Sequence, residues 1–289
     1  MAVRIGIDVG GTFTDFILTR DGAPPLLHKV LSTPADPSIA VVEGLVELAA
    51  MADPAKSVEQ FAASIDAIVH GTTVTTNATL TGTGAKSALI TTEGVRDALE
   101  MRRGIREEQY NNAYTNVKPL VPRYLRIGVP GRLDRAGREL TPLSLSAVRR
   151  ALELFRAEGV QAVSVCFMNS FANPAHERAA AALVREALPD AYLTVSSELL
   201  PSIRFYDRLS TTALNSYVGP KLNHYLEQLV NRLRGIDFGG LLLIMQSNGG
   251  VMTAEAGRRR PVHVIESGPA AGVIATAALA RRIGLGNVI

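Results

Sequence analysis

Hydrophobic and polar residues alternate at the start of the chain and predict a β-strand. Val3, Ile5 and Ile7 stand at every second position, and a second apolar run follows at residues 16–18. Between them lies the sequence DVGGTFTD at residues 8–15. A strand, a glycine-containing turn and a returning strand together predict a β-hairpin.

The same patterns divide the rest of the chain into strands and helices. Further strands are expected at residues 26–30, 65–69, 87–90, 160–167, 192–195 and 241–245. Helices are expected at residues 38–50, 71–80, 94–100, 145–158, 174–188 and 205–234, with a last helix that begins within 266–272 and ends at 282. Alternating strands and helices are typical of α/β proteins with mainly parallel sheets. Residues 102–130 lose this periodicity, and we interpret them as an ordered loop that faces a site.

Composition and charge narrow the possible classes of protein. The 289 residues suffice for two domains or lobes, each with its own core. The net charge of +3 comes from dispersed basic residues, which argues against nucleic acid as a partner. The single cysteine, Cys166, lies in an apolar run, so we expect it to be buried. No leader and no run of 18 apolar residues occurs, so we expect a cytoplasmic protein that makes no membrane contact.

The residues of the first hairpin suit the binding of phosphate. Gly10 and Gly11 would allow positive φ angles and a close approach of backbone N–H groups to an anion, and Thr12 and Thr14 would add hydroxyl donors. Asp8 could hold a hydrated Mg²⁺ or orient a water molecule beside the phosphates. This strand-turn-strand loop resembles the phosphate loop of the actin-like ATPase superfamily. The alternative is an ordinary glycine-rich hairpin.

A second polar cluster follows a buried strand at residues 70–77, HGTTVTTN. We predict that it opens a helix, where free N–H groups and the helix dipole favour an anion. His70 could act as an acid, a base or a metal ligand, Thr72 and Thr73 as donors to phosphate or substrate, and Asn77 as an orienting amide. The alternative is a helix cap with a structural histidine.

Three further groups of residues are candidates for binding. Ser247 and Asn248 follow a buried strand, where open sheets place ligands, although an Asn-Gly turn explains them equally well. In the sequence ESGPAAG at residues 266–272, Ser267 or Gly268 is expected to cap the last helix, and Glu266 could face a nucleotide or complement the helix dipole. The arginines of the irregular segment, Arg102, Arg103 and Arg106, could meet an anionic substrate or remain solvated.

Five motifs in order, DVGGTFTD, HGTTVTTNATL, ALITTEGVRDALE, MQSNGG and ESGPAAG, resemble the hydantoinase/oxoprolinase family over essentially the whole chain. The family includes ATP-dependent hydantoinases, 5-oxoprolinases and subunits of acetone and acetophenone carboxylases. The resemblance implies an α/β fold of the actin-like (ribonuclease H-like) ATPase type, incomplete here, with the hairpin as first phosphate loop and an inserted α/β unit. It also implies an N-terminal family region at residues 1–195 and the start of the core region at 196–289.

The family chemistry implied by this resemblance is ATP-dependent hydrolysis of a cyclic amide of the hydantoin or 5-oxoproline type, with Mg²⁺, by phosphoryl activation of a carbonyl oxygen. The run at residues 101–107, MRRGIRE, departs from the Gly-Arg-Gln or Gly-Asn-Gln type of sequence associated with hydantoinases, so a ketone carboxylase subunit remains an alternative. A sugar kinase and a non-catalytic ATP-binding module are further alternatives.

The resemblance also implies which residues form the site and what else the site requires. The expected catalytic residues are Asp8, which would hold Mg²⁺ through water, and His70, Thr72, Thr73 and Asn77. The expected nucleotide-binding residues are Gly10, Gly11, Thr12, Thr14, Asp15, Glu266 and Gly268. The expected substrate-binding residues are Arg102, Arg103, Arg106, Ser247 and Asn248. The second acidic glycine-rich loop of such ATPases does not occur in the sequence. We therefore expect a missing C-terminal half, a partner subunit of hydantoinase B type, or both, and poor binding of ATP by the chain alone.

Overall fold

The computed structural model describes residues 2–104 and 106–288, and these residues form two compact units. The first unit comprises the residues up to Thr83 together with those from Lys221 onward. The second unit is Gly84–Pro220. The spatial division thus differs from the predicted family regions 1–195 and 196–289, which remain a prediction about sequence regions.

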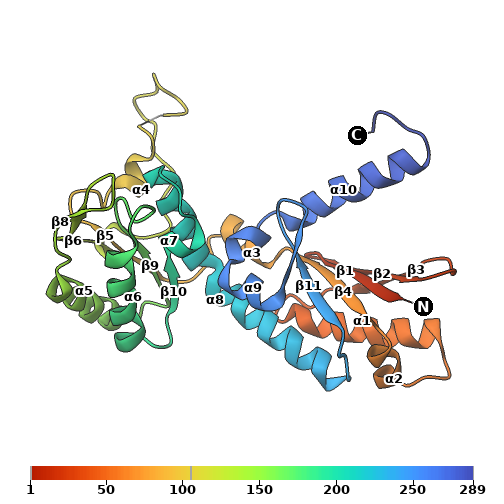
Figure 1. Cartoon of the computed structure of the whole chain (residues 1–289). Helices are drawn as coiled ribbons and strands as arrows, with labels where there is room; N and C mark the ends of the chain where they lie inside the picture. Colours follow the sequence, from red (N-terminus) through yellow and green to blue (C-terminus); the bar gives the residue numbers. More distant parts are fainter. Residues whose placement is uncertain (1, 105, 289) are drawn as a thin grey trace. The chain divides into compact units, whose positions relative to one another are not determined.

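The first unit is built on a mixed six-stranded sheet with the strand order β12-β11-β4-β1-β2-β3 (Figure 1). Its strands are β1 (Val3–Val9), β2 (Phe13–Arg20), β3 (Leu26–Leu31), β4 (Ala67–Thr72), β11 (Leu241–Met245) and β12 (Val251–Thr253). The central strands β1, β4 and β11 run parallel, whereas β2, β3 and β12 are added as antiparallel hairpin partners. The carboxyl ends of three parallel strands therefore meet at one edge of the sheet.

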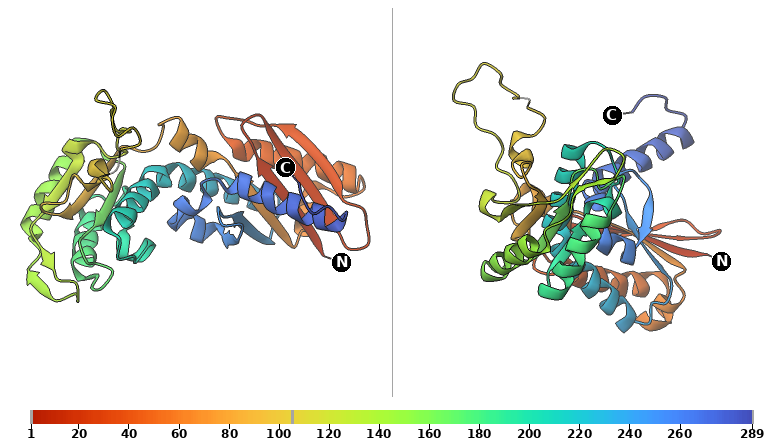
Figure 2. Two further views of the ribbon diagram at one scale, coloured as in Figure 1. Left: turned by 90° about the horizontal axis from the view of Figure 1, so that it is seen from above. Right: turned by 60° about the vertical axis from the view of Figure 1, so that its left-hand side comes forward.

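Helices cover the two faces of this sheet unequally. The helical segments are α1 (Pro37–Ala52), α2 (Val58–Ala63), α3 (Val74–Leu80), the second part of α8 (Phe205–Gly235), α9 (Ala254–Arg259), the 3₁₀ helix η2 (Pro261–Val264) and α10 (Ser267–Arg282). One face packs against α1 and α8 around a core that includes Ile5, Ile7, Leu45 and Leu226. On the opposite face α10 contacts β4 and β11, as two views show (Figures 1 and 2).

The second unit contains a fully parallel sheet with the order β10-β9-β5-β6. Its strands are β5 (Ser87–Thr92), β6 (Arg126–Val129), β9 (Ala162–Cys166) and β10 (Tyr192–Val195), and a small separate hairpin joins β7 (Arg132–Leu133) to β8 (Glu139–Thr141). Its helical segments are α4 (Ala98–Met101), η1 (Arg123–Leu125), α5 (Leu145–Ala157), α6 (Ala175–Ala187), α7 (Ser196–Leu199) and the first part of α8. Every residue of β5 and β9 is buried, as expected for strands covered on both faces.

A buried ion pair joins the helices of the second unit. The side chains of Arg208 on α8 and Glu177 on α6 are both fully buried, with 3.5 Å between Nη1 and Oε1. Glu177 accepts hydrogen bonds from the Phe167 N–H (2.8 Å), the Ser196 hydroxyl (2.5 Å) and the Ser197 N–H (2.8 Å). Because each buried charge has several partners, these hydrogen bonds offset the cost of removing both charges from water.

The structure confirms the mixed α/β architecture with parallel strands and changes several details. Cys166 is buried as predicted, and its burial raises the pKa of the thiol to about 12. The helix predicted at 94–100 is reduced to α4, because Gly94 takes a positive φ of 86° within a turn. Strand β5, which was expected at residues 87–90, pairs with β9 and β6 of the second unit. Within the described residues, no helix is both long and apolar enough to cross a lipid bilayer.

Candidate functional site

The hairpin of β1 and β2 is closed at its tip by backbone hydrogen bonds. The Gly10 N–H donates to the Phe13 carbonyl at 3.0 Å. Ser32, just beyond β3, secures the turn from the side: its N–H donates to the Thr12 carbonyl (2.9 Å) and its hydroxyl donates to the Gly10 carbonyl (2.9 Å). The tip is therefore a fixed turn and not a loose loop.

The two glycines of the tip differ from the prediction. Neither Gly10 nor Gly11 adopts a positive φ, so the turn does not use the left-handed conformation that glycine allows. A Cβ at Gly10 would lie only 3.1 Å from the Phe13 carbonyl oxygen, whereas a Cβ at Gly11 would meet nothing within 4 Å. Gly10 is thus required for close packing, and Gly11 borders open space that a ligand could occupy.

Donors at the tip are available to a ligand. In the described parts of the chain, the N–H groups of Gly11 and Thr12 donate to no protein acceptor, and both residues are exposed. Thr14 differs, because it is fully buried and its hydroxyl lies 3.0 Å from that of Ser32. Two backbone donors and the Thr12 hydroxyl therefore face outward, as an anion site requires.

Asp8 and Asp15 face each other across the hairpin. They are a register pair of β1 and β2, and Lys29 on β3 forms an ion pair with Asp15 at 2.9 Å. Partial burial, and to a lesser extent the charge of Asp15, raise the pKa of Asp8. Among the described residues, no three His, Cys, Asp or Glu side chains gather as a metal cluster. Mg²⁺ commonly keeps several waters and binds one or two carboxylates plus phosphate, so the exposed Asp8 beside the free donors fits hydrated Mg²⁺ with a nucleotide.

The second motif lies differently from the prediction. Strand β4 continues through Thr72, so His70, Gly71 and Thr72 belong to a strand and do not open a helix. Helix α3 begins only at Val74, and its N-cap residue Thr73 makes no side-chain capping bond. The reason is parallel pairing with β1, which extends as far as Val9 opposite Thr72.

Thr73 and Asn77 connect α3 to the hairpin. Both the N–H and the hydroxyl of Thr73 donate to the Val9 carbonyl, at 3.2 and 3.3 Å. The Asn77 amide donates to the Thr73 hydroxyl at 3.2 Å. These two predicted residues therefore lie next to the end of β1, where the hairpin turn begins.

The side chain of His70 lies on the buried face of the sheet. It is fully buried, and burial lowers its pKa to about 4, so its imidazole is neutral at pH 7. Its Nε2 lies 2.7 Å from the hydroxyl of Tyr225 on α8. Successive side chains of a strand point to opposite faces, and a Cβ at the next residue, Gly71, would lie 2.9 Å from Oδ1 of Asp8. His70 and Asp8 thus occupy opposite faces, and the structure does not bring their side chains together.

The start of α10 lies at the same edge of the sheet. The N-cap residue is Glu266, in a left-handed conformation with a φ of 60°, so the expected cap at Ser267 or Gly268 is wrong. The Glu266 N–H donates to the Thr76 hydroxyl at 2.9 Å, and the buried Ser267 hydroxyl donates to the Thr72 carbonyl at 3.3 Å. A Cβ at Gly268 would meet nothing within 4 Å. Glu266 is therefore exposed at the carboxyl end of β4, and Gly268 is half-buried with open space beside it.

The residues after β11 form a tight turn. Ser247 donates through its N–H (2.8 Å) and its hydroxyl (2.7 Å) to the His263 carbonyl, and the Asn248 side chain accepts from the Gly250 N–H at 2.9 Å. Gly249 has a φ of 83°, and a Cβ there would overlap Ile274 of α10. This is the Asn-Gly turn that was the alternative to a ligand site.

The predicted arginines belong to the second unit, and two of them have acidic partners. Arg102 makes a bidentate ion pair with Glu107, and Arg103 contacts Asp207 at 2.5 Å. Arg106 is exposed. These three residues follow α4, where the chain leaves the sheet as a long loop (Figure 1).

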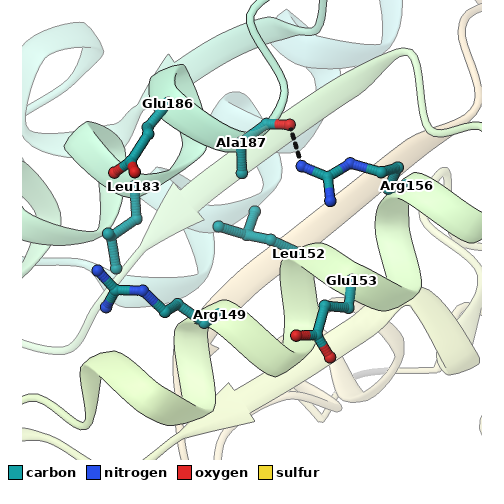
Figure 3. Close-up of a pocket in the computed structure, with 7 residues that line it drawn as sticks. All are labelled: Arg149, Leu152, Glu153, Arg156, Leu183, Glu186 and Ala187. Carbon is teal, nitrogen blue, oxygen red and sulfur yellow. Dashed lines mark hydrogen bonds between the residues drawn. The ribbon is translucent and has the colours of Figure 1, made fainter.

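A surface groove of the second unit contains none of the predicted residues. Figure 3 shows it between α5 and α6, where the lining residues are Arg149, Leu152, Glu153, Arg156, Leu183, Glu186 and Ala187. The Arg156 guanidinium donates to the Ala187 carbonyl at 2.7 Å at the end of α6. Two arginines balance two glutamates here, so the groove has no net charge of either sign.

The candidate site is therefore the carboxyl edge of the sheet in the first unit. It gathers the hairpin tip, Asp8, Thr73, Asn77 and the start of α10, while Thr14 and His70 lie in the interior. Sequence reasoning missed Ser32 and Tyr225. Tyr225 stands at helical spacing between Leu222 and Leu229, which indicates burial, but its hydrogen-bonding partner is 155 residues away.

Comparisons with known proteins show the family to which the chain belongs. The model of the hydantoinase/oxoprolinase N-terminal region matches residues 4–188, and the hydantoinase/oxoprolinase model matches residues 208–289. The chain belongs to the hydantoinase/oxoprolinase family. It is 39% identical to the caprolactamase subunit alpha of Pseudomonas jessenii over 288 residues, which are 99% of this chain and 41% of the relative.

Two further comparisons extend this relationship. The acetophenone carboxylase gamma subunit of Aromatoleum aromaticum is 32% identical over 99% of this chain and 40% of the relative. The crystal structure of the ATP-dependent caprolactamase from Pseudomonas jessenii superposes with a TM-score of 0.88 over 99% of this chain and 41% of that chain. The chain thus spans about two fifths of the length of these family members.

Proposed function

We propose that the hairpin tip is one half of the ATP site of an ATP-dependent enzyme that hydrolyses a cyclic amide. The observation that carries the proposal is the set of outward-facing donors on Gly11 and Thr12 beside the exposed carboxylate of Asp8. The similarity to a caprolactamase whose structure is described as ATP-dependent supports the reaction class. The strand order around the hairpin, with three parallel strands ending at this edge, supports an actin-like arrangement.

When bound, ATP would give its terminal phosphoryl group to the amide carbonyl oxygen and leave as ADP. One water would then add to the carbonyl carbon while the C–N bond breaks and the nitrogen takes up a proton, and a second water would release the phosphate, so that the products are the ring-opened amino acid, ADP and inorganic phosphate. In this proposal the N–H groups of Gly11 and Thr12 and the Thr12 hydroxyl bind phosphate oxygens. Asp8 holds hydrated Mg²⁺. The ion pair of Asp15 with Lys29 determines the net charge beside Asp8. Each of these groups stabilises negative charge that moves during phosphoryl transfer.

The neighbouring elements complete the phosphate side of the site. We assign Thr73 and Asn77 to orienting the hairpin and the substrate, and Glu266 and Gly268 to the nucleotide at the start of α10. His70 and Thr72 are buried, so we assign them an indirect role: they fix the position of the end of β4. Ser247 and Asn248 shape the adjoining turn, and Arg102, Arg103 and Arg106 are assigned to substrate only through the family resemblance.

The rest of the site comes from outside the 289 residues. Actin-like enzymes close a nucleotide between two lobes, and the family members named above are more than twice as long as this chain. We propose that a C-terminal continuation, a partner subunit of hydantoinase B type, or both supply the second phosphate loop. Measurable ATP turnover by the isolated 289 residues would contradict this.

A subunit of an ATP-dependent ketone carboxylase is the second candidate. The similarity to the acetophenone carboxylase gamma subunit extends over 99% of this chain, so the same ATP half-site would serve that chemistry. The greater identity to the caprolactamase subunit, 39% against 32%, favours the hydrolase.

The test is release of ADP by the full-length protein with any partner subunit that its activity requires. Cyclic amides, 5-oxoproline and ketones with bicarbonate are compared as substrates. Stimulation by a cyclic amide supports the hydrolase, and stimulation by ketone plus bicarbonate supports the carboxylase. Stimulation by a hexose, or by no substrate, would favour a kinase or a non-catalytic ATP-binding module.

The variant Asp8→Asn tests whether the hairpin takes part in the release of ADP. Removal of the carboxylate that holds Mg²⁺ should lower the rate of ADP release by about 100-fold or more, equivalent to about 2.7 kcal/mol. The folded state should not lose stability, because the pKa of Asp8 is raised and its charge is unfavourable there. Asp21→Asn, at the exposed turn after β2, is the matched control and should keep full activity. Unchanged turnover in Asp8→Asn would show that the hairpin is not part of the ATP site.

A further inference from the structure

A buried contact between Tyr225 and His70 lies directly beneath the candidate site. The Tyr225 hydroxyl and His70 Nε2 are 2.7 Å apart, and the exposed fractions of the two residues are 4% and 0%. Their rings also pack together, with centroids 5.7 Å apart. The other ring nitrogen, Nδ1, has no partner in the described parts of the chain. The contact with Tyr225 is therefore the hydrogen bond that holds this imidazole in place.

The two residues after His70 are attached to three separate parts of the site. Gly71 lies against the Asp8 carboxylate, as the position of its missing Cβ indicates. The Thr72 carbonyl accepts the Ser267 hydroxyl at the start of α10, and the Thr72 side chain also interacts with the Tyr225 phenol. A displacement of the end of β4 would consequently shift Asp8 and the first turn of α10 together.

We propose that Tyr225 is a positioning residue of the ATP site: by holding His70 it fixes the end of β4 and thereby the placement of Asp8 and of the start of α10. This inference rests on the proposed function of the site. It assigns a functional role to a helix residue that no phosphate-loop motif contains. It also explains why a histidine that cannot reach a nucleotide stands within the motif HGTT.

The hairpin tip is held by Ser32 and not by Tyr225, so the support of the tip and the support of β4 can be tested separately. Among the described residues, Ser32 hydrogen-bonds to the carbonyls of Gly10 and Thr12 and to the Thr14 hydroxyl, and forms no hydrogen bond with β4. A disturbance at Tyr225 should therefore affect the placement of the Asp8 carboxylate but leave the backbone donors of the tip in position. A disturbance at Ser32 should do the opposite.

The first experiment compares Tyr225→Phe with wild type in the full-length enzyme, with rates expressed per folded molecule. We expect kcat for ADP release to fall about tenfold, while the KM for ATP stays within twofold. Ser32→Ala should raise the KM for ATP more than it lowers kcat. Tyr192→Phe removes the hydroxyl of another largely buried tyrosine, in the second unit, and should leave both constants unchanged. A merely structural role would lower the amount of folded Tyr225→Phe enzyme without changing kcat, and that result would overturn the proposal.

The second experiment does not depend on catalysis. Amide hydrogen exchange in Tyr225→Phe should accelerate at residues 72–75 and 267–271, and stay as in wild type at residues 10–14. Uniform acceleration, or none, would overturn the positioning role. If wild type releases no ADP with any substrate, the proposed function fails, whereas the exchange pattern still decides whether Tyr225 fixes the end of β4.

Discussion

Two groups of polar residues in this molecule are organised in opposite ways. In the second unit, Arg208 and Glu177 are fully buried, and every charged atom has close partners. At the hairpin tip of the first unit, the N–H groups of Gly11 and Thr12 are exposed and donate to no protein acceptor in the described residues. Buried polar groups are paired within the fold, whereas the exposed donors of the hairpin tip remain free to bind a ligand, which we propose is phosphate.

The largest effect is expected when one partner of the buried ion pair is removed. Arg208→Met leaves the Glu177 carboxylate buried without its cation, so the free energy of unfolding should fall by about 3–5 kcal/mol. Arg150→Met, at an exposed position of α5, should change it by less than about 0.5 kcal/mol. Urea unfolding of the three proteins measures the difference. A loss below about 1 kcal/mol in Arg208→Met would mean that the pair contributes little to the fold.

A second prediction concerns the buried His70, which has the neutral form in the folded state. Its pKa is lowered from about 6.5 to about 4, so the unfolded chain binds more protons between these values. The free energy of unfolding should therefore fall as the pH drops from about 6.5 to about 4, by about 3 kcal/mol from this group.

The control for this pH dependence is His70→Phe, which lacks the titrating group. Its unfolding free energy should depend less on pH than that of wild type across the same interval. Equal slopes for wild type and variant would show that His70 is accessible to protons in the folded protein.

A third prediction tests the contact between β4 and Asp8. Gly71→Ala places a methyl group about 2.9 Å from Asp8 Oδ1, which the flexible carboxylate can avoid only by moving. Stability should change by less than about 1 kcal/mol, but kcat for ADP release should fall by about tenfold or more, because misplaced catalytic groups are costly. Gly239→Ala, at an open position before β11, is the matched control. Retention of wild-type kcat would show that Asp8 does not need this placement.

Much of the fold followed from the sequence because period-two and period-3.6 patterns are local. The hairpin, β3, α1 and the strand–helix pairs of the second unit could all be predicted in this way. The partners of β5 and β11 could not, because pairings such as Ile244 with His70 join residues far apart in the chain. Alternation alone would have placed Ile68, His70 and Thr72 on one face, and this signal was available for predicting that His70 is buried.

The site was predictable to a similar extent. The motifs predicted Asp8, the glycines and Thr73, because phosphate chemistry demands such residue types near a strand end, and the structure places them at one edge of the sheet while their roles stay a prediction. Other features depend on which side chains the folded chain brings together, so the motifs could not predict them. They are the exposure of Thr12 against the burial of Thr14, the support from Ser32, and the contact of Tyr225 with His70. Helix ends were also missed, since parallel pairing extends β4 through Thr72 at the expense of α3.

The central claim is that the open space at Gly11 is where phosphate binds, and Gly11→Ala tests it most directly. The position has no positive φ, and an added Cβ would meet nothing within 4 Å, so the midpoint of thermal unfolding should stay the same or rise slightly. In the full-length enzyme the KM for ATP should rise about tenfold, equivalent to about 1.4 kcal/mol, while Gly239→Ala keeps the wild-type value. An unchanged KM in a folded Gly11→Ala enzyme would contradict the assignment of the hairpin tip to the phosphates of ATP.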